Sequence, residues 1–313
     1  MNIDHAVTVN NLSMKFGDFT AVNQINFTVN RGEIFGFLGP NGCGKSTTIR
    51  MLCGIITPTS GSGTVAGLDI TKDSERIRTK IGYMSQKFSL YEDLTVDENI
   101  QFFADIYDVA LDKIDERRTW ILEMAGLTER ADSLAGELST GWKQRLALGC
   151  AMVHSPEVLF LDEPTGGVDP VSRRQFWTII DEMAHQGVTV FVTTHYMDEA
   201  EHCQRLALMY AGKLIALDTP VNLKKMITEG MLLKISADPV GKALELLVDY
   251  EDVVDVSIFG TDIHVMVESV GMEEKLAVFL RGNGIIIHEI IPVSPSLEDL
   301  FIHLMGIAEE EVL

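Results

Sequence analysis

Residues 34–46 read IFGFLGPNGCGKS, an apolar run that leads directly into a loop rich in glycine. A continuous apolar run of this length is typical of a central strand buried on both faces. The residues after the loop, 47–53, have helical character. The order of strand, glycine-rich loop and helix therefore predicts an α/β fold built on a parallel sheet.

The loop fits the pattern G-x-x-x-x-G-K-[ST] at every fixed position. Glycines let the backbone curve around a phosphate group, and the following helix adds the positive end of its dipole. We expect Lys45 to reach the β- and γ-phosphate oxygens and Ser46 to hold Mg²⁺. A glycine-rich turn that carries a lysine by chance is the alternative, and the flanking strand and helix argue against it. The predicted phosphate-binding residues are Gly39, Pro40, Asn41, Gly42, Cys43, Gly44, Lys45, Ser46 and Thr47.

A second apolar run, VLFLDE at residues 158–163, ends in two adjacent carboxylates. Buried strands seldom end this way unless a cation lies nearby. Asp162 suits a contact to Mg²⁺, and Glu163 suits activation of the water that attacks a γ-phosphate. Taken alone, the pair is explained equally well as a solvated strand end. Together with the phosphate loop, the reading as a catalytic pair is favoured.

The rest of the pattern indicates two domains, residues 1–225 and 226–313. Alternating residues from about 6 to 36 predict antiparallel strands, and a mostly helical insert is expected at about 90–155. After residue 226 the order is strand, helix, strand, strand, helix, strand, which predicts a small α+β ferredoxin-like domain. The last helix is expected at residues 297–305.

The composition limits the possible functions. The net charge is −21, and residues 226–313 contribute −13 of it, with 17 acidic and 4 basic residues. This balance argues against binding to nucleic acid, which requires clustered Lys and Arg. The scattered cysteines (Cys43, Cys53, Cys150 and Cys203) predict reduced, mostly buried thiols. No apolar run is long enough to span a bilayer and no secretory signal is evident, so we expect a cytoplasmic protein.

Four further segments follow in order: GYMSQ at 82–86, LSTGW at 138–142, GVD at 167–169 and TH at 194–195. Together with the loop and the acid pair, they make the chain resemble the nucleotide-binding subunits of ABC transporters, from about residue 7 to 220. The resemblance implies a P-loop NTPase core with an N-terminal antiparallel β subdomain and a helical insert. It also implies an ATPase that uses ATP and Mg²⁺.

The resemblance also assigns roles to individual residues. It implies that Phe16 stacks on adenine, although a half-buried strand residue explains Phe16 equally well. Gln86 matches the glutamine that senses Mg²⁺ and the attacking water, and His195 matches the histidine that contacts the γ-phosphate. Asp169 matches the aspartate that communicates across a dimer of subunits. The implied catalytic residues are thus Glu163, His195, Gln86 and Lys45, and the implied metal contacts are Ser46, Gln86 and Asp162.

The segment LSTGW departs from the family norm, Leu-Ser-Gly-Gly-Gln. Ser139 and Gly141 are retained, and the resemblance implies that they bind the γ-phosphate held by the opposite subunit. Thr140 replaces a glycine and can crowd the backbone, whereas Trp142 cannot make the hydrogen bonds of glutamine. Gly-Trp at this place resembles a subgroup of bacterial multidrug or ion exporters. We therefore expect working hydrolysis with an altered rate or affinity.

The family organisation implies two kinds of partner. One is a second ATPase subunit, in a homodimer or a paralogous heterodimer, and the other is a separate transmembrane permease, contacted through Gln86 and residues 87–99. The chain would then lie on the inner face of the cell membrane, attached only through the permease. The acidic C-terminal part resembles accessory domains of drug- and polyketide-type exporters. Two alternatives remain: a soluble ABC-type ATPase acting on nucleic acid or the ribosome, and a regulatory nucleotide binder with weak hydrolysis.

Overall fold

The computed structural model describes residues 5–87, 89–227, 231–267, 269 and 271–310. They divide into two compact units, the first ending at Leu217 and the second beginning at Asp218. Within the described residues, no helix is both long and apolar enough to cross a membrane.

The centre of the first unit is a six-stranded sheet with the order β10-β9-β3-β8-β7-β6. The pairs β9–β3, β3–β8, β8–β7 and β7–β6 are parallel. The runs predicted as central strands form β3 and β7, and every residue of these two strands is buried. The strands are β3 (Ile34–Leu38), β6 (Ile81–Met84), β7 (Val158–Asp162), β8 (Thr189–Thr194), β9 (Arg205–Tyr210) and β10 (Lys213–Asp218).

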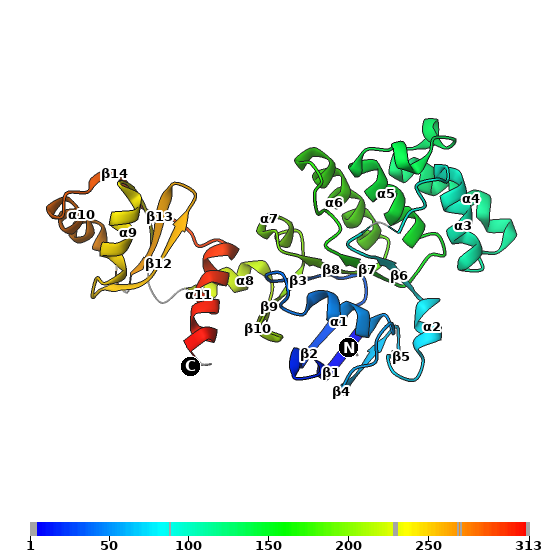
Figure 1. The fold of residues 1–313 in the computed structure, drawn as a ribbon, viewed down its shortest axis with the longest axis horizontal. Helices are drawn as coiled ribbons and strands as arrows, with labels where there is room; N and C mark the ends of the chain where they lie inside the picture. Colours follow the sequence, from blue (N-terminus) through cyan, green and yellow to red (C-terminus); the bar gives the residue numbers. More distant parts are fainter. Residues whose placement is uncertain (1–4, 88, 228–230, 268, 270, 311–313) are drawn as a thin grey trace. The chain divides into compact units, whose positions relative to one another are not determined.

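A second sheet, antiparallel and ordered β2-β1-β4-β5, packs on one side of the central sheet together with helix α1 (Figure 1). Its strands are β1 (His5–Phe16), β2 (Phe19–Asn30), β4 (Ser60–Val65) and β5 (Leu68–Asp69). Phenylalanine rings fill the space between the two sheets: Phe27 of β2 stacks on Phe35 at 5.5 Å and meets Phe37 edge-on at 5.1 Å. The expected antiparallel subdomain is therefore present, joined to the core by aromatic packing.

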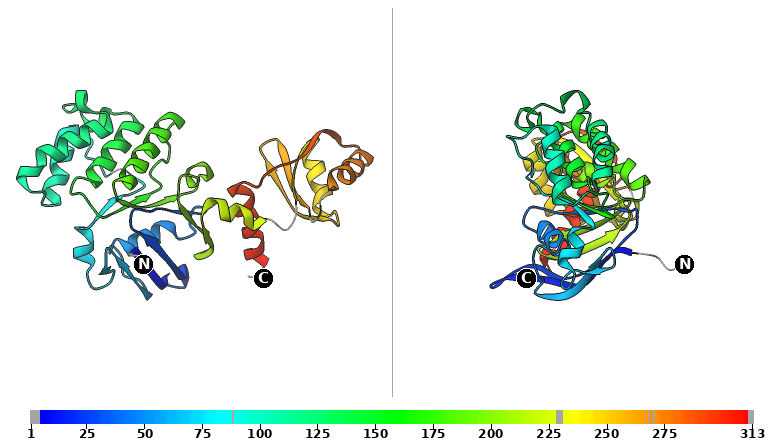
Figure 2. Two further views of the ribbon diagram at one scale, coloured as in Figure 1. Left: turned by 180° about the vertical axis from the view of Figure 1, so that it is seen from behind. Right: turned by 90° about the vertical axis from the view of Figure 1, so that its right-hand side faces the viewer.

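Helices cover the opposite side of the central sheet, where α5 and α6 lie in Figures 1 and 2. Between β6 and β7, helices α3, α4 and α5 surround an apolar core of their own, in the interval where the helical insert was expected. The helices of the unit are α1 (Lys45–Leu52), α2 (Ser74–Arg78), α3 (Val96–Ile106), α4 (Leu111–Ala125), α5 (Thr140–Ala151), α6 (Pro170–His185) and α7 (Met197–Ala200), with short 3₁₀ turns at Thr128–Arg130 and Ala135–Glu137.

The start of α3 organises the segment that follows Gln86. Thr95 caps the helix in a reciprocal pair with Glu98, and the fully buried Asn99 donates to the carbonyls of Tyr91, Leu94 and Thr95. A buried amide stays in place only if its hydrogen bonds are made, so these bonds fix the turn. The helical insert is thereby tied to the chain that leaves β6.

The second unit has an antiparallel four-stranded sheet with the order β12-β13-β11-β14. One apolar cluster joins Leu233 and Ile235 of the sheet to Leu247 of α9 and Leu276 of α10. Its elements are α8 (Pro220–Lys224), a 3₁₀ turn at Lys225–Ile227, β11 (Met231–Asp238), α9 (Val240–Val248), β12 (Val253–Phe259), β13 (Asp262–Val267), α10 (Met272–Gly282), β14 (Ile286–Pro292) and α11 (Leu297–Glu310). Strands and helices thus follow the order predicted from the sequence.

Helix α11 is fastened to the sheet of its own unit by a buried pair: His264 Nδ1 of β13 lies 2.6 Å from Asp299 Oδ1. The other oxygen of Asp299 accepts from the N–H and the hydroxyl of Ser296, which caps the helix start. Helix α11 also contacts α8. Helix α8 therefore packs within the second unit, together with the helix that closes it.

Candidate functional site

The glycine-rich loop joins β3 to α1, as expected for a phosphate loop. Gly44 precedes the helix with φ 113°, a backbone conformation that side chains disfavour. A Cβ at Gly39 would meet the carbonyl oxygen of Met209 at 2.2 Å, so only glycine fits there. Helix α1 therefore points its N-terminal N–H groups at the space beside the loop, which favours an anion.

Lys45 is the first residue of α1 and is 4% exposed. Its ammonium donates to the carbonyls of Gly39 (2.7 Å) and Pro40 (3.1 Å), so the side chain folds back over the loop. It also lies 3.1 Å from Glu163 Oε1. A buried ammonium with three oxygen partners is fully paired, and the loop and the end of β7 are thereby joined.

Ser46, the next residue, donates its hydroxyl proton to Asp162 Oδ1 at 2.8 Å. Thr193 of β8 donates to the same oxygen, also at 2.8 Å. The hydroxyl and carboxylate oxygens at this place are the hard ligands that Mg²⁺ prefers, so the residues fit that ion. Among the described residues, no cluster of three or more His, Cys, Asp or Glu side chains is arranged to hold a metal.

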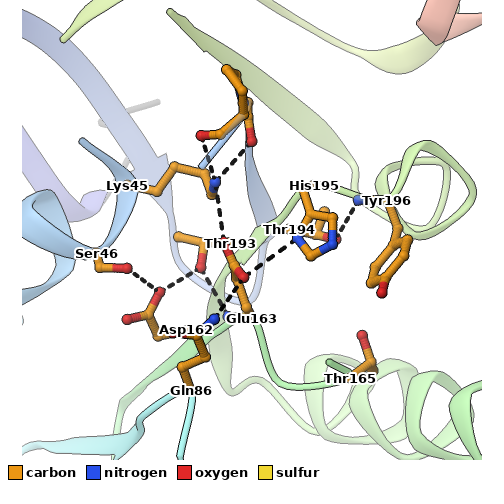
Figure 3. Close-up of polar contacts among 12 residues, drawn as sticks. Lys45, Ser46, Gln86, Asp162, Glu163, Thr165, Thr193, Thr194, His195 and Tyr196 are labelled. Atoms are coloured by element: carbon orange, nitrogen blue, oxygen red, sulfur yellow. Dashed lines mark hydrogen bonds and ion pairs between the residues drawn. The ribbon is translucent and has the colours of Figure 1, made fainter. Parts of the chain in front are cut away.

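Three side chains converge on the carboxylate of Glu163, as Figure 3 shows. Besides Lys45, Gln86 Nε2 donates to Glu163 Oε2 at 3.1 Å, and His195 Nδ1 lies 3.3 Å from the same oxygen. Lys45 begins α1 directly after the loop, and Gln86 and His195 follow the ends of β6 and β8. The four residues expected to be catalytic are thus brought together at the carboxyl ends of parallel strands, where ligands of such sheets bind.

Glu163 has a left-handed backbone with φ 48°, unusual for a residue with a side chain. Its N–H is directed at Thr193, whose carbonyl oxygen and hydroxyl oxygen lie 3.1 Å and 3.0 Å away. The turn away from β7 is therefore imposed by the neighbouring strand, and it aims the carboxylate at the phosphate loop.

Other predicted site residues lie apart from this cluster. Phe16 ends β1 with 52% of its side chain exposed, so its ring is available for stacking. Asp169 caps α6 by accepting from the N–H groups of Val171 and Ser172. Hydrogen bonds from Ser172 hold the pKa of Asp169 below its usual value. Asp169 is therefore an exposed carboxylate on a fixed turn.

The segment LSTGW begins helix α5. Ser139 precedes the helix and is exposed, and its hydroxyl accepts no capping hydrogen bond from the helix N–H groups. Trp142 is half-buried against the core of the helical insert, with the Arg130 guanidinium 4.2 Å from its ring centre. The tryptophan thus has a packing role within the insert. A Cβ at Gly141 would meet the Ser172 hydroxyl at 2.5 Å, which explains the retained glycine.

Cys43 of the loop is buried, as predicted, and burial raises the pKa of its thiol. The other three cysteines are also buried and free, which confirms the prediction of reduced, buried thiols.

Sequence reasoning missed the buried polar residues that hold the site: Thr193, Gln144 and Glu199. Gln144 donates to the carbonyl of Pro164, next to Glu163, at 2.6 Å. The only sequence signal was polarity within otherwise buried segments.

Comparison with known proteins assigns the family. Residues 22–166 match the ABC transporter family model. A probable multidrug ABC transporter ATP-binding protein, YbhF of Escherichia coli (strain K12), is 54% identical over 213 residues, which are 68% of this chain and 37% of that protein. This chain thus spans little more than a third of the length of that relative.

A second relative matches over nearly its whole length. The linearmycin resistance ATP-binding protein LnrL of Bacillus subtilis (strain 168) is 34% identical over 95% of this chain and 97% of that protein. Among solved structures, the dimeric, post-hydrolysis ATP-binding cassette MJ0796 bound to ADP and Pi has a TM-score of 0.62 and 26% identity, covering 68% of this chain and 98% of that one. The resemblance inferred from the motifs is confirmed: the chain belongs to the ABC transporter family, among its ATP-binding proteins.

Proposed function

We propose that this chain is the ATP-hydrolysing motor subunit of an exporter. The observation that carries the proposal is the convergence of Lys45, Gln86 and His195 on the carboxylate of Glu163. Such a cluster joins a phosphate-binding loop to a general base, which is the minimum that phosphoryl transfer to water requires.

The phosphate loop would hold the β- and γ-phosphates of ATP. Lys45 would exchange its contact with Glu163 for the phosphate oxygens, which frees the carboxylate for chemistry. Ser46 and Asp162 would hold Mg²⁺, which neutralises the charge of the phosphates when it is bound. Gln86 is proposed as a further contact of the ion, and the exposed ring of Phe16 as the surface that stacks on adenine.

Glu163 would accept a proton from the attacking water while the water oxygen bonds to the γ-phosphorus. The bond between that phosphorus and the bridging oxygen then breaks, and ADP and phosphate are released. His195 lies beside the carboxylate and would orient the γ-phosphate, and Gln86 would orient the water. The contacts of Gln86 and His195 with the Glu163 carboxylate support these roles.

A second copy or a paralogous subunit would complete each site. Ser139 and Gly141 lie at the N-terminus of α5, where a hydroxyl and backbone N–H groups suit an anion. We infer that they bind the γ-phosphate held by the partner and that Asp169 contacts the partner at the same interface. The dimeric form of the related cassette supports this arrangement.

The permease would dock on a groove beside β6. The groove has a volume of about 400 Å³, and its lining combines apolar and aromatic side chains with charged ones: Ile55, Tyr83, Ile106, Tyr107, Glu75, Arg78 and Asp108. Ile55 and Ile106 are 47% and 56% exposed, which together with the charged lining suits an amphipathic helix of a partner. Tyr91, in the segment expected to contact the permease, packs edge-on against Phe102 at 4.5 Å and is still 49% exposed, whereas Phe88 of that segment lies outside the described residues. Export is supported by the names of the two relatives, which refer to multidrug transport and linearmycin resistance.

The second unit is proposed as a ferredoxin-like accessory domain that supports dimerisation or regulates the motor. The order of its elements and the order of its strands, β12-β13-β11-β14, support this proposal. The test is deletion of the second unit. Deletion from Asp218 onward removes both α8 and α11, which contact each other, whereas deletion after residue 225, the expected boundary, would leave α8 behind. Loss of dimerisation or a changed ATPase rate in the truncated chain is the expected result. Unchanged values for both would contradict the proposal.

The role of Glu163 is tested by Glu163→Gln. The amide keeps the shape of the side chain but cannot take a proton, so we expect kcat to fall at least ~100-fold. ATP binding should persist, and the variant should accumulate as an ATP-bound dimer. The measurements are phosphate release and size-exclusion chromatography with and without ATP.

Glu157→Gln is the matched control, because Glu157 is a surface acid that pairs with Arg31 and Lys80. It should hydrolyse ATP like the parent chain. Turnover by Glu163→Gln at the parent rate would refute the assigned mechanism.

A further inference from the structure

Glu199 is a buried carboxylate, 1% exposed, in the short helix α7, and the chemistry proposed above does not use it. Its two oxygens have different partners. The hydroxyl of Thr165 donates to Oε1, and the hydroxyl of Thr194 donates to Oε2 at 2.7 Å. Arg173 Nε of α6 lies 3.3 Å from Oε1 as an ion pair. A buried charge with such partners is held in one geometry.

The two threonines belong to the two segments that carry the proposed chemistry. Thr194 immediately precedes His195, and Thr165 follows Glu163 by two residues in the loop that leads to Asp169. Each of the two segments is therefore held by a different oxygen of Glu199. The positions of Thr165, Thr194 and His195 are labelled in Figure 3.

Arg173 strengthens the same link from the other side of His195. Its guanidinium lies 4.3 Å from the ring centre of Tyr196, and the N–H of Tyr196 donates to the Thr194 hydroxyl at 2.9 Å. Thr194, before His195, is thus bound directly by Glu199. Tyr196, after it, contacts two partners of Glu199, namely Arg173 and Thr194. His195 therefore lies between two residues that are held in place, Thr194 and Tyr196. Its own ring contacts Glu163 and Tyr196.

We propose that Glu199 is a positioning residue that fixes the segment around His195 to the loop from Glu163 to Asp169. Through this link, the spacing of His195 and Glu163 in one site depends on the loop whose far end carries Asp169. Displacement of Asp169 by a partner subunit would then be passed to His195. The inference rests on the proposed function and extends it to a residue outside the site.

The test separates positioning from folding by removing one hydroxyl at a time. Thr165→Val and Thr194→Val keep the volume of the side chain and each break one half of the link. We expect each variant to lower kcat about 10- to 100-fold while the affinity for ATP stays within about twofold, because small displacements of reacting groups cost that much in rate. The double variant should be no slower than the slower single variant, since one missing bond already uncouples the segments.

Thr189→Val is the matched control. Thr189 is a buried threonine in β8, the strand that contains Thr194, but it lies at the opposite end of that strand, and its hydroxyl accepts from the N–H of Gly32. It should lower the melting temperature and leave kcat unchanged. Parent-like kcat in both Thr165→Val and Thr194→Val would overturn the role of Glu199, as would multiplicative losses in the double variant. Failure of the parent chain to hydrolyse ATP would instead overturn the proposed function, and this inference with it.

Discussion

Glu163 has a backbone conformation that residues with a side chain rarely adopt. A left-handed backbone costs a residue with a side chain about 1–2 kcal/mol, and φ is 48° here. The conformation persists because Thr193 accepts from the Glu163 N–H while its hydroxyl also donates to Asp162. One threonine thus orients both acids of the pair. Local strain at the residue that carries the proposed chemistry is offset by the neighbouring strand.

Gly39→Ala tests how far the site depends on the close approach of the loop to β9. The new Cβ would meet the carbonyl oxygen of Met209 at 2.2 Å and Cys43 Sγ at 2.8 Å, so the loop must move. The Gly39 carbonyl accepts from Lys45, so this movement also displaces the lysine. We expect at least ~10-fold weaker ATP binding, the cost of about 1.4 kcal/mol of lost interaction, measured by titration with a fluorescent ATP analogue.

Gly241→Ala is the control, since Gly241 lies in α9 with open space around its Cα. It should bind ATP like the parent chain and be slightly more stable, because alanine favours a helix. Parent-like affinity in Gly39→Ala would show that the loop can shift without loss.

At the scale of elements, the sequence predicted strands by their apolar runs and misjudged where one of them ends. The residues VTVFV at 188–192 are a further apolar run, which predicts a buried strand ending at Val192, yet β8 continues to Thr194. Thr193 and Thr194 are polar and therefore resemble the start of a loop, but both are buried because their hydroxyls are bound by Asp162 and Glu199. Apolar pattern alone cannot detect a buried strand end whose polar groups are satisfied by distant residues.

The site was predictable to the extent that single segments carry its chemistry. The phosphate loop and the acid pair follow from residue types and spacing. Gln86 and His195 were identified through the family resemblance, because Gln86 meets Glu163 across 77 positions of chain. Gln144 and Glu199 escaped prediction, since a polar residue on a helix does not reveal whether tertiary packing buries it.

His154 joins the helical insert to the central sheet in a way that depends on pH. Its Nε2 donates to the carbonyl of Ile81 in β6, and its ring stacks on Tyr107 at 3.8 Å. Nδ1 is buried without a hydrogen-bond partner, so protonation there would bury an unpaired charge. The pKa of His154 is lowered to about 4, mainly by burial; the nearby charge of Arg117 also lowers it, and the hydrogen bond to Ile81 acts in the opposite direction.

A lowered histidine pKa makes the folded state less stable in acid. Between about pH 6.5 and 4 the unfolded chain binds a proton that the folded chain does not, so stability is full above pH 6.5 and falls as the pH decreases. By pH 5 the loss is about 2 kcal/mol. Urea unfolding followed by tryptophan fluorescence at pH 7.5 and 5.0 reports on the first unit, which contains all three tryptophans, Trp120, Trp142 and Trp177.

His154→Gln should reduce that loss by most of the 2 kcal/mol, because glutamine can donate to Ile81 but does not titrate. The variant will be less stable at pH 7.5, since it lacks the stacking on Tyr107. The comparison is therefore the difference between the two pH values within each protein. An equal difference in the two proteins would assign the acid sensitivity to other groups.

At the scale of the whole molecule, charge and packing divide the chain at the same place. The second unit has an apolar core of its own, and from residue 218 onward 18 acidic residues stand against 6 basic ones, a net charge of −12 in 96 residues. The first unit carries −9 over 217 residues. Self-repulsion of this kind destabilises a compact state and is screened by salt.

Raising the salt concentration should therefore stabilise the second unit more than the first. We expect heating followed by circular dichroism to resolve two transitions, of which only the first unit's is seen by tryptophan fluorescence. Between 20 and 300 mM NaCl the fluorescence-silent transition should shift upward by a few degrees, as expected for about 1 kcal/mol in a domain of this size, and the other should move less. Sodium chloride is compared with uncharged sucrose, which stabilises compact states without screening charge and should shift both transitions. A single transition, or equal shifts in NaCl, would mean that the two units unfold as one cooperative body despite their separate cores.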